Sequence, residues 1–155
     1  MNDPVIRGAL LDFLAKTKND PNTILVSEMG LSEGKAIIDV AMINGLMYGY
    51  EIKSDVDTLY RLDRQIETYK NYFQKLTIVT TKTHLAKVRQ KCPQWVGIML
   101  AYEENGVVLI RQLRQAKLNR RTKKQEITSL MWRDEAKTIL HARGVKGLSS
   151  KPRAQ

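Results

Sequence analysis

The sequence has one cysteine and no long apolar run, and each absence excludes a class of protein. Cys92 stands alone among 155 residues, so an internal disulfide framework is excluded. No cluster of cysteine and histidine has the spacing of a zinc site. No apolar run approaches the ~18 residues of a membrane span, and Met1–Pro4 lacks the basic start of a signal peptide. We therefore expect a cytoplasmic protein with no membrane partner.

Acidic residues are scarce in the last third of the chain. Residues 1–110 contain 13 Lys/Arg and 13 Asp/Glu, whereas residues 111–155 contain 13 Lys/Arg and three acids, so the whole net charge of +10 lies in the last 45 residues. A cationic segment on a neutral body suits a polyanion such as nucleic acid, and the alternative is a solubilising arm. The predicted nucleic-acid contacts in this segment are Arg114, Lys117, Arg120, Arg121, Lys123 and Lys124.

The length predicts one domain, or two at most. We expect a core domain over residues 1–112, followed by a basic segment over residues 113–155. Within that segment, the apolar pattern predicts one helix over residues 126–142, and the Gly/Ser/Pro content predicts a mobile tail.

Hydrophobic periodicity predicts helices alternating with strands. The predicted elements are a helix over 3–17, a hairpin over 35–53 turning at 44–45, a helix over 55–74, a strand over 75–81, a helix over 84–91 and a hairpin over 95–111. Residues 24–26 are a short apolar run whose type the pattern does not decide, and residues 30–34 are expected to form a loop. This order indicates an α/β or α+β domain, a mixed sheet with helices packed on it.

Three charged residues on the first hairpin carry the chemical signal. Asp39 interrupts an otherwise apolar strand, where an unpaired carboxylate is costly. Glu51 and Lys53, two residues apart on the return strand, share one face. Two carboxylates and an ammonium on neighbouring strands could hold Mg²⁺ and a water, with the lysine orienting the water or offsetting phosphate charge. The alternative is a surface ion pair on an edge hairpin.

The hairpin register decides whether the two carboxylates can meet. A strict two-residue turn at Asn44-Gly45 places Asp39 opposite Tyr50, with Glu51 on the other face. One additional residue, either in the turn or as a bulge for which Gly49 is the candidate, places Asp39 opposite Glu51. The metal-site hypothesis therefore requires that additional residue.

The segments Ile37–Ala41 and Tyr50–Asp55 resemble the motif of the PD-(D/E)XK nuclease superfamily, which has the restriction-endonuclease-like fold. The resemblance spans roughly residues 25–102 and is strongest to a group of small bacterial and phage proteins assigned to that superfamily. It implies a mixed sheet flanked by helices and a divalent-metal-dependent nuclease. One departure is that Ile38 precedes Asp39, at the position where the motif that names the superfamily has a proline.

The resemblance also implies roles for individual residues. Asp39 and Glu51 correspond to the acids that bind Mg²⁺ or Mn²⁺, the Ile52 carbonyl to a further ligand, and Lys53 to the catalytic lysine. Many members carry another acid on the preceding segment, and Glu28 is the candidate metal ligand there. A solvent-facing loop acid is the alternative for Glu28.

A second motif follows on the predicted helix. Gln65 and Tyr69 match the Gln-x-x-x-Tyr of RecB-like members, and four residues apart on a helix means one face. Gln65 is the predicted catalytic residue, and Tyr69 a predicted contact to the nucleic-acid strand. Tyr69 also belongs to the apolar stripe of the helix, so core packing is its alternative. Arg61 and Arg64 are predicted to contact phosphate, the alternative being a solvated face.

The sequence predicts a Mg²⁺-dependent nuclease that hydrolyses phosphodiester bonds in DNA. One alternative is a nucleic-acid-binding protein of the same fold without turnover, and another is a basic protein whose tail binds a partner. A homodimer or a targeting partner is left open, as is the choice between DNA and RNA. Neither a glycine-rich phosphate loop nor a base-readout module is visible.

Overall fold

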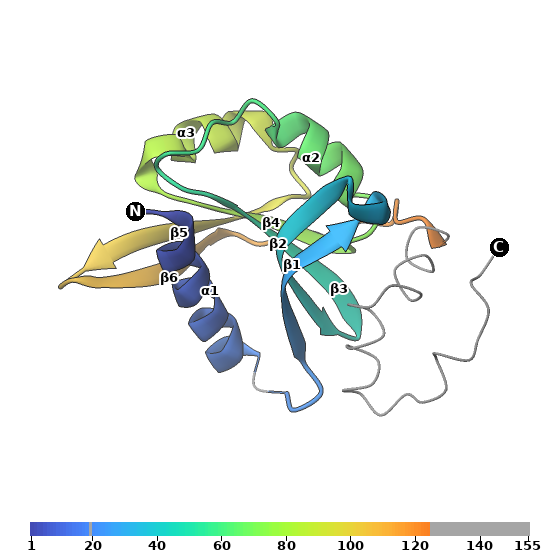
Figure 1. The fold of residues 1–155 in the computed structure, drawn as a ribbon, viewed down its shortest axis with the longest axis horizontal. Coiled ribbons are helices and arrows are strands. Elements are labelled where there is room, and N and C mark those ends of the chain that lie inside the picture. The colour runs from blue at the N-terminus through green and yellow to red at the C-terminus, as the bar shows by residue number, and fades with distance from the viewer. Residues whose placement is uncertain (19, 125–155) are drawn as a thin grey trace.

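The chain folds around a mixed sheet with helices on both faces (Figure 1). The computed structural model describes residues 1–18 and 20–124. The elements are α1 (Asp3–Thr17), β1 (Ile24–Leu31), the 3₁₀ turn η1 (Ser32–Gly34), β2 (Ala36–Asn44), β3 (Leu46–Lys53), α2 (Leu62–Tyr69), β4 (Lys75–Thr80), α3 (Lys82–Lys91), β5 (Gly97–Glu104) and β6 (Val107–Arg114). The predicted class, an α/β mixed sheet flanked by helices, is confirmed.

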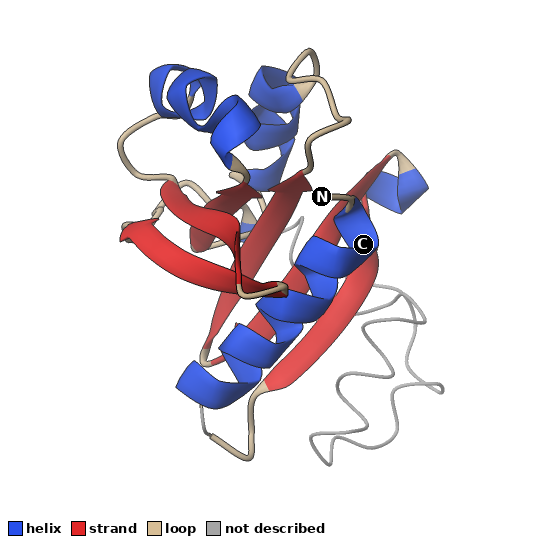
Figure 2. Cartoon of the chain, turned by 90° about the vertical axis from the view of Figure 1, so that its left-hand side faces the viewer, coloured by secondary structure: helices blue, strands red, loops and turns tan. Residues whose placement is uncertain are grey.

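The strands lie in chain order, β1 to β6, in one six-stranded sheet of the described residues. β1, β2 and β3 pair antiparallel, β3, β4 and β5 pair parallel, and β6 returns antiparallel to β5. Each parallel pair needs a crossover, and α2 and α3 supply the two crossovers. Figure 1 shows α2 and α3 together on one side of the sheet, and Figure 2 shows α1 running across the other side.

Each face of the sheet has its own core. Ile6, Leu10 and Leu14 recur at helical spacing on α1 and are buried against one face of β2–β5. The other face is covered by buried residues of α2, the turn after it and α3, among them Tyr69, Phe73 and Val88. The middle strands are therefore covered on both sides.

The first hairpin has the register that the metal-site hypothesis requires. Val40 pairs with Tyr50, so the next position along the two strands brings Asp39 opposite Glu51. The additional residue lies in the turn, where Gly45 has a φ of +72°. Gly49 pairs regularly with Ala41 and is not a bulge.

The helix predicted over residues 55–74 is wrong in its first and last thirds, because α2 covers only Leu62–Tyr69. The Asp57 carboxylate accepts hydrogen bonds from the Ser54 N–H and hydroxyl, at 2.7 and 2.9 Å. Asp55 accepts from the hydroxyls of Thr81 and Thr83. These local bonds fix a loop over residues 54–61 in place of the first turns of the predicted helix.

Three other expectations change with the structure. The run at 24–26 is the start of β1, and part of the loop expected over 30–34 belongs to that strand. The boundary expected at residue 112 falls within β6. Beyond β6 the chain binds back onto the core, since the buried Asn119 side chain donates to the carbonyls of Lys70 and Phe73. The helix expected over 126–142 and the mobile tail lie outside the described residues.

Helices long and apolar enough to cross a membrane do not occur within residues 1–18 and 20–124.

Substitution by alanine should change the free energy of unfolding in opposite directions at Gly49 and at Gly8. A Cβ at Gly49 would lie 2.8 Å from the buried Phe73 ring, whereas one at Gly8, on the exposed side of α1, meets no atom within 4 Å. We expect Gly49→Ala to lower the free energy of unfolding by roughly 1–3 kcal/mol through overpacking. Gly8→Ala should raise it by about 1 kcal/mol, through helix propensity. Urea unfolding of both variants measures these free energies. Changes of the same sign in the two variants would contradict the close packing of Phe73 against Gly49.

The buried Cys92 should be a poor nucleophile in the folded protein. Burial raises the pKa of its thiol to about 11, because a low-dielectric surrounding disfavours the thiolate. The thiolate fraction at pH 8 is therefore reduced, and alkylation of the folded chain should be roughly a hundredfold slower than in denaturant. The folded-state rate should still be rising near pH 10. A plateau below pH 9 would mean that the thiol is exposed.

Candidate functional site

Three acids occupy the same level of three neighbouring strands. Ser27, Val40 and Tyr50 lie opposite one another across β1, β2 and β3. The next position on each strand holds Glu28, Asp39 and Glu51, the three acids predicted as metal ligands. Glu28 and Asp39 do not form a backbone pair between β1 and β2, and Asp39 and Glu51 do not form one between β2 and β3. The regular strand pairing is therefore interrupted at this level.

Glu51 is buried and held by side chains of α2. Gln65 Nε2 donates to Glu51 Oε1 at 3.0 Å, and the Tyr69 hydroxyl lies 2.9 Å from Oε2. The Lys53 ammonium lies 3.6 Å from Oε1. Lys53 is itself buried, and its carbonyl accepts a hydrogen bond from the Thr80 hydroxyl on β4. The structure therefore brings Glu51, Lys53, Gln65 and Tyr69 together.

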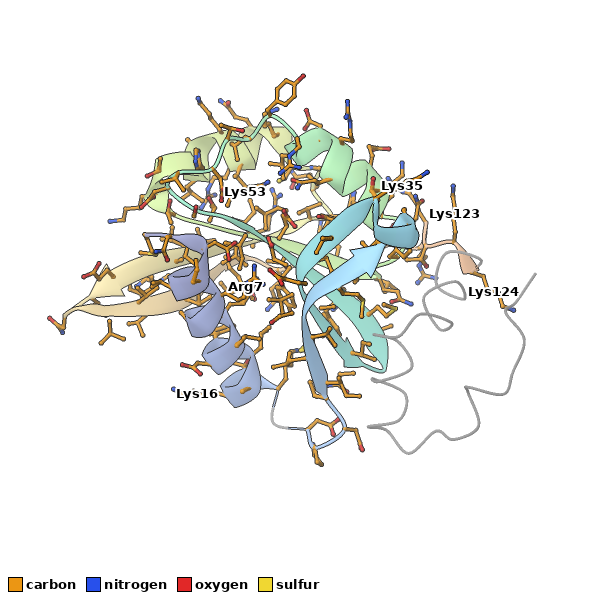
Figure 3. The ribbon with its side chains drawn as sticks, viewed as in Figure 1. Arg7, Lys16, Lys35, Lys53, Lys123 and Lys124 are labelled. Carbon is orange, nitrogen blue, oxygen red and sulfur yellow. The ribbon has the colours of Figure 1, made fainter. Side chains whose placement is uncertain are left out.

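Asp39 bridges the gap where β2 separates from β3. Its Oδ2 accepts a hydrogen bond of 2.7 Å from the Ile52 N–H, in place of a ladder bond between the strands. The Ile52 carbonyl lies on the same side of the strand as that N–H, because both groups of one strand residue point to the same neighbour. Asp39 Oδ1 lies 3.4 Å from the guanidinium of Arg7 on α1. Figure 3 shows Arg7 projecting from α1 toward the middle strands.

Burial raises the pKa of both carboxylic acids, and the charge of a neighbouring acid adds to the effect at each. Desolvation is the larger cause for Glu51, and the nearby Asp39 charge is the second; together they raise its pKa to about 8. Desolvation also raises the pKa of Asp39, opposed by the Ile52 hydrogen bond and by the Arg7 charge. Two acids that cannot both ionise cheaply are typical of a site that receives a cation.

Glu28 does not join this pair. Its backbone has a left-handed φ of +56°, which is unusual for a residue other than glycine, and its side chain is 71% exposed. The carboxylate lies 3.5 Å from Arg7 Nη1. Within residues 1–18 and 20–124, no group of three acidic, histidine or cysteine side chains is placed to hold a metal ion. Glu28 is thus at the predicted level of the strand and lines the same cleft as Asp39 and Glu51, with its carboxylate beside Arg7.

Tyr69 has a different position from the one predicted. It is only 1% exposed, so its ring is packed in the core, although the residue also lines the cleft described below. Its hydroxyl lies 2.9 Å from Glu51 and 3.0 Å from the Ile37 carbonyl. Core packing, the alternative to strand contact that the sequence left open, is present, and the hydroxyl of the buried ring also reaches Glu51.

A cleft of about 530 Å³ opens onto the acid pair, between α2 and the start of β2. Asp39 and Glu51 line it from the sheet, together with Gln65 and Tyr69 from α2. Its other lining residues include three cations, Lys35, Arg61 and Arg64. Arg61 and Arg64 are thus placed where phosphate contacts were expected. The cleft combines an acidic floor with a cationic rim.

The predicted contacts of the basic segment lie elsewhere. The residues lining the cleft do not include Lys117, Arg120, Arg121, Lys123 or Lys124, which are exposed on the stretch that follows β6. In Figure 3, Lys123 and Lys124 lie at the same end of the molecule as Lys35.

Arg114 is half-buried, unlike the other predicted contacts of the basic segment. Its guanidinium donates from Nε and Nη2 to the carbonyls of Val96 and Pro93, at 2.9 and 3.1 Å, and so ties β6 to the loop before β5. These two bonds engage only part of a group that has five N–H donors.

The donor set fits a hard divalent cation. Asp39 and Glu51 supply carboxylate oxygens and Ile52 a backbone carbonyl, which are ligands that Mg²⁺ prefers. Gln65 Oε1 is buried without a hydrogen-bond partner, beside Glu51. A bound water could satisfy this atom, because an amide oxygen accepts hydrogen bonds. A cation would also relieve the repulsion between the two carboxylates.

Sequence reasoning missed Arg7. Its guanidinium lies among three acids, 2.9 Å from Asp3, 3.5 Å from Glu28 and 3.4 Å from Asp39. One signal was available, because Arg7 precedes the buried Leu10 by three residues and therefore lies near the apolar stripe of α1. A charge at such a position calls for a partner across the interface.

Comparison of the sequence with known families gives one match over nearly the whole chain. Residues 1–154 match the family of bacteriophage P4 protein cII. The chain belongs to that family. Protein cII of Enterobacteria phage P4 is 26% identical over 145 residues, which cover 94% of this chain and 55% of the relative. The chain therefore spans about half the length of that curated relative.

Two solved structures are similar to the chain. A protein of unknown function from Silicibacter pomeroyi, SPO1766, superposes with a TM-score of 0.60 at 15% identity, covering 92% of each chain, and shows a shared fold. Pyrococcus furiosus SfsA, solved in complex with Ca²⁺, has a TM-score of 0.44 at 10% identity and covers 74% of this chain and 64% of its own. Similarity at that level bears on neither the site nor the activity.

Removing the repulsion within the acid pair should stabilise the metal-free protein. Asn at position 39 can still accept the Ile52 N–H, but it brings no charge next to Glu51. We expect Asp39→Asn to raise the free energy of unfolding in EDTA by about 1 kcal/mol, as is common when a functional acid is neutralised.

The matched control is Asp63→Asn on α2, where the acid is 69% exposed and paired only with Lys91. That substitution should change the free energy of unfolding by less than about 0.5 kcal/mol. Urea unfolding monitored by circular dichroism measures both variants. A loss of stability in Asp39→Asn would show that its charge is fully compensated by Arg7.

Proposed function

We propose that this protein is a divalent-metal-dependent nuclease of the restriction-endonuclease-like type, hydrolysing phosphodiester bonds in DNA. The observation that carries the proposal is the pair of acids at one level of β2 and β3, with Lys53 3.6 Å from Glu51. An ion pair on an edge hairpin would be solvated, whereas Glu51 and Lys53 are both buried on a middle strand. Burying two charged side chains costs free energy, and such an arrangement is expected where it serves a function.

The side chains divide the chemistry between them. Asp39, Glu51 and the Ile52 carbonyl would hold Mg²⁺ or Mn²⁺, which polarises the scissile phosphate and lowers the pKa of bound water. Lys53 is placed to orient the attacking water and to offset charge on the phosphate. Gln65 and Tyr69 hold the two oxygens of Glu51 in place. Arg7 holds Asp39 from the opposite face of the sheet.

The substrate would approach across the cationic rim. Lys35, Arg61 and Arg64 line the cleft and are placed to receive phosphates on either side of the scissile bond. The basic stretch after β6 adds positive charge outside the cleft, at the end of the molecule where Lys35 lies, so it would add affinity for phosphate and not position the scissile bond. DNA is the proposed substrate class, by the resemblance to PD-(D/E)XK nucleases.

Cleavage of plasmid and single-stranded DNA with Mg²⁺ or Mn²⁺ tests this function. We expect nicking that EDTA abolishes and that Asp39→Ala and Lys53→Ala each reduce by at least about a hundredfold, as is typical for removal of a catalytic group. Lys91→Ala is the matched control, because Lys91 makes an exposed ion pair with Asp63 on the surface. It should cut like the unmodified chain.

Two results would contradict the proposal. Cutting that survives in Asp39→Ala would indicate a contaminating nuclease or another site. Tight, salt-sensitive DNA binding with no cleavage under either metal would favour the binding protein without turnover.

A further inference from the structure

Three of the large apolar side chains that the described residues expose lie on the two segments that lead to the cleft: Ile37 lines it, and Val56 and Tyr60 lie on the loop that ends at Arg61, which also lines it. Tyr60 is 89% exposed and Val56 is 83% exposed, both on the loop that leads into α2. Ile37, on the first strand of the opposite wall, is 54% exposed and lines the cleft directly. Apolar side chains gathered at one place on a surface, unlike single scattered ones, indicate a contact site.

The loop that carries Tyr60 and Val56 is held in place. Asp55 is anchored by two threonine hydroxyls at the start of α3, and Asp57 closes a turn onto Ser54. Leu59 is buried between the two exposed residues. The chain therefore buries one apolar residue of this loop and holds two others out in solvent.

Cations alternate with these apolar side chains. Tyr60 directly precedes Arg61, and Arg64 follows one helical turn later. On the other wall, Lys35 precedes Ile37 by two residues. Arg61, Arg64 and Lys35 all line the cleft above Asp39 and Glu51. Alternating cations and aromatic or apolar groups are the pattern that binds an unpaired nucleic-acid strand, through its phosphates and the faces of its bases.

We propose that the mouth of this cleft binds single-stranded nucleic acid, with Tyr60 stacking on a base next to the scissile phosphate. A paired base buries both faces in the helix stack, so Tyr60 can stack only on an unpaired or terminal base. Arg61 and Arg64 hold the flanking phosphates, and Ile37 packs against a base from the other wall. This inference rests on the proposed function for the position of the phosphate, and it narrows the substrate to an unpaired strand.

Binding in EDTA tests the inference without requiring cleavage. Fluorescence anisotropy compares a labelled oligothymidine with a labelled duplex that has no unpaired loop, for Tyr60→Ala, Tyr60→Trp and the matched control Tyr102→Ala. Tyr102 is a half-buried aromatic on β5 that stacks with Arg111 away from the cleft. We expect Tyr60→Ala to weaken single-strand affinity by about tenfold or more and to leave duplex affinity unchanged. Tyr60→Trp should retain the single-strand affinity, because it keeps a stacking surface.

Three outcomes would overturn the inference: no loss in Tyr60→Ala, an equal loss on duplex, or the same loss in Tyr102→Ala. Because no metal is present, these outcomes are separate from those of the cleavage assay. Strand binding that depends on Tyr60 in a chain that never cuts DNA would support this surface and exclude the nuclease. DNA cleavage that is unchanged in Tyr60→Ala, with no loss of single-strand affinity, would support the nuclease and contradict the role of Tyr60.

Discussion

The burial of Glu51 beside Asp39 is the constraint on which the rest of the cleft depends. Two carboxylates removed from water repel each other, and neither can ionise without compensation. Every polar group around them offsets part of that cost: Gln65, Tyr69 and Lys53 at Glu51, and the Ile52 N–H and Arg7 at Asp39. These groups come from both faces of the sheet, so the acid pair ties α1 and α2 to the same point on β2 and β3.

The sheet makes room for the pair by departing from a regular ladder. β2 and β3 separate beyond Val40 and Tyr50, and the Asp39 carboxylate takes the N–H that a ladder carbonyl would have accepted. On the other side of β2, Glu28 adopts a left-handed conformation at the same level. Unpaired backbone and a positive φ both cost free energy, and such features persist where the surrounding structure holds them in place. Here the two flanking cores, with α1 on one face and α2 on the other, supply that support.

The charge distribution separates two tasks. Within the cleft the acids lie on the floor and Lys35, Arg61 and Arg64 lie at the rim, so that a polyanion meets positive charge first. The excess of positive charge in the chain as a whole comes after residue 110, and the exposed basic residues after β6 are outside the cleft. The chain belongs to the phage P4 protein cII family and shares its fold with SPO1766. Neither the family name nor the fold specifies a reaction, so the proposed chemistry rests on the residues of the cleft.

Local patterns were sufficient to predict much of this molecule. Two largely apolar runs on either side of Asn44-Gly45 predicted the first hairpin, and the two-residue period of a strand placed Glu51 and Lys53 on one face. Helical spacing predicted α1 with its observed bounds, and the four-residue interval between Gln65 and Tyr69 predicted that both share one face. These features depend on neighbours in the chain, and a sequence displays them directly.

The tertiary structure decided what depends on distant contacts. It placed the additional hairpin residue in the turn and left Gly49 in a regular pair, where the close approach of Phe73 leaves no room for a Cβ. It shortened α2, because threonines of the next crossover hold Asp55 in a loop. It also brought Arg7 to Asp39, 32 residues away, and placed the Glu28 carboxylate beside the same guanidinium. The sequence by itself determined which residues could form an acid pair on one hairpin. Only packing across both faces of the sheet decided which side chains surround that pair, since burial and charge compensation arise between elements far apart in the chain.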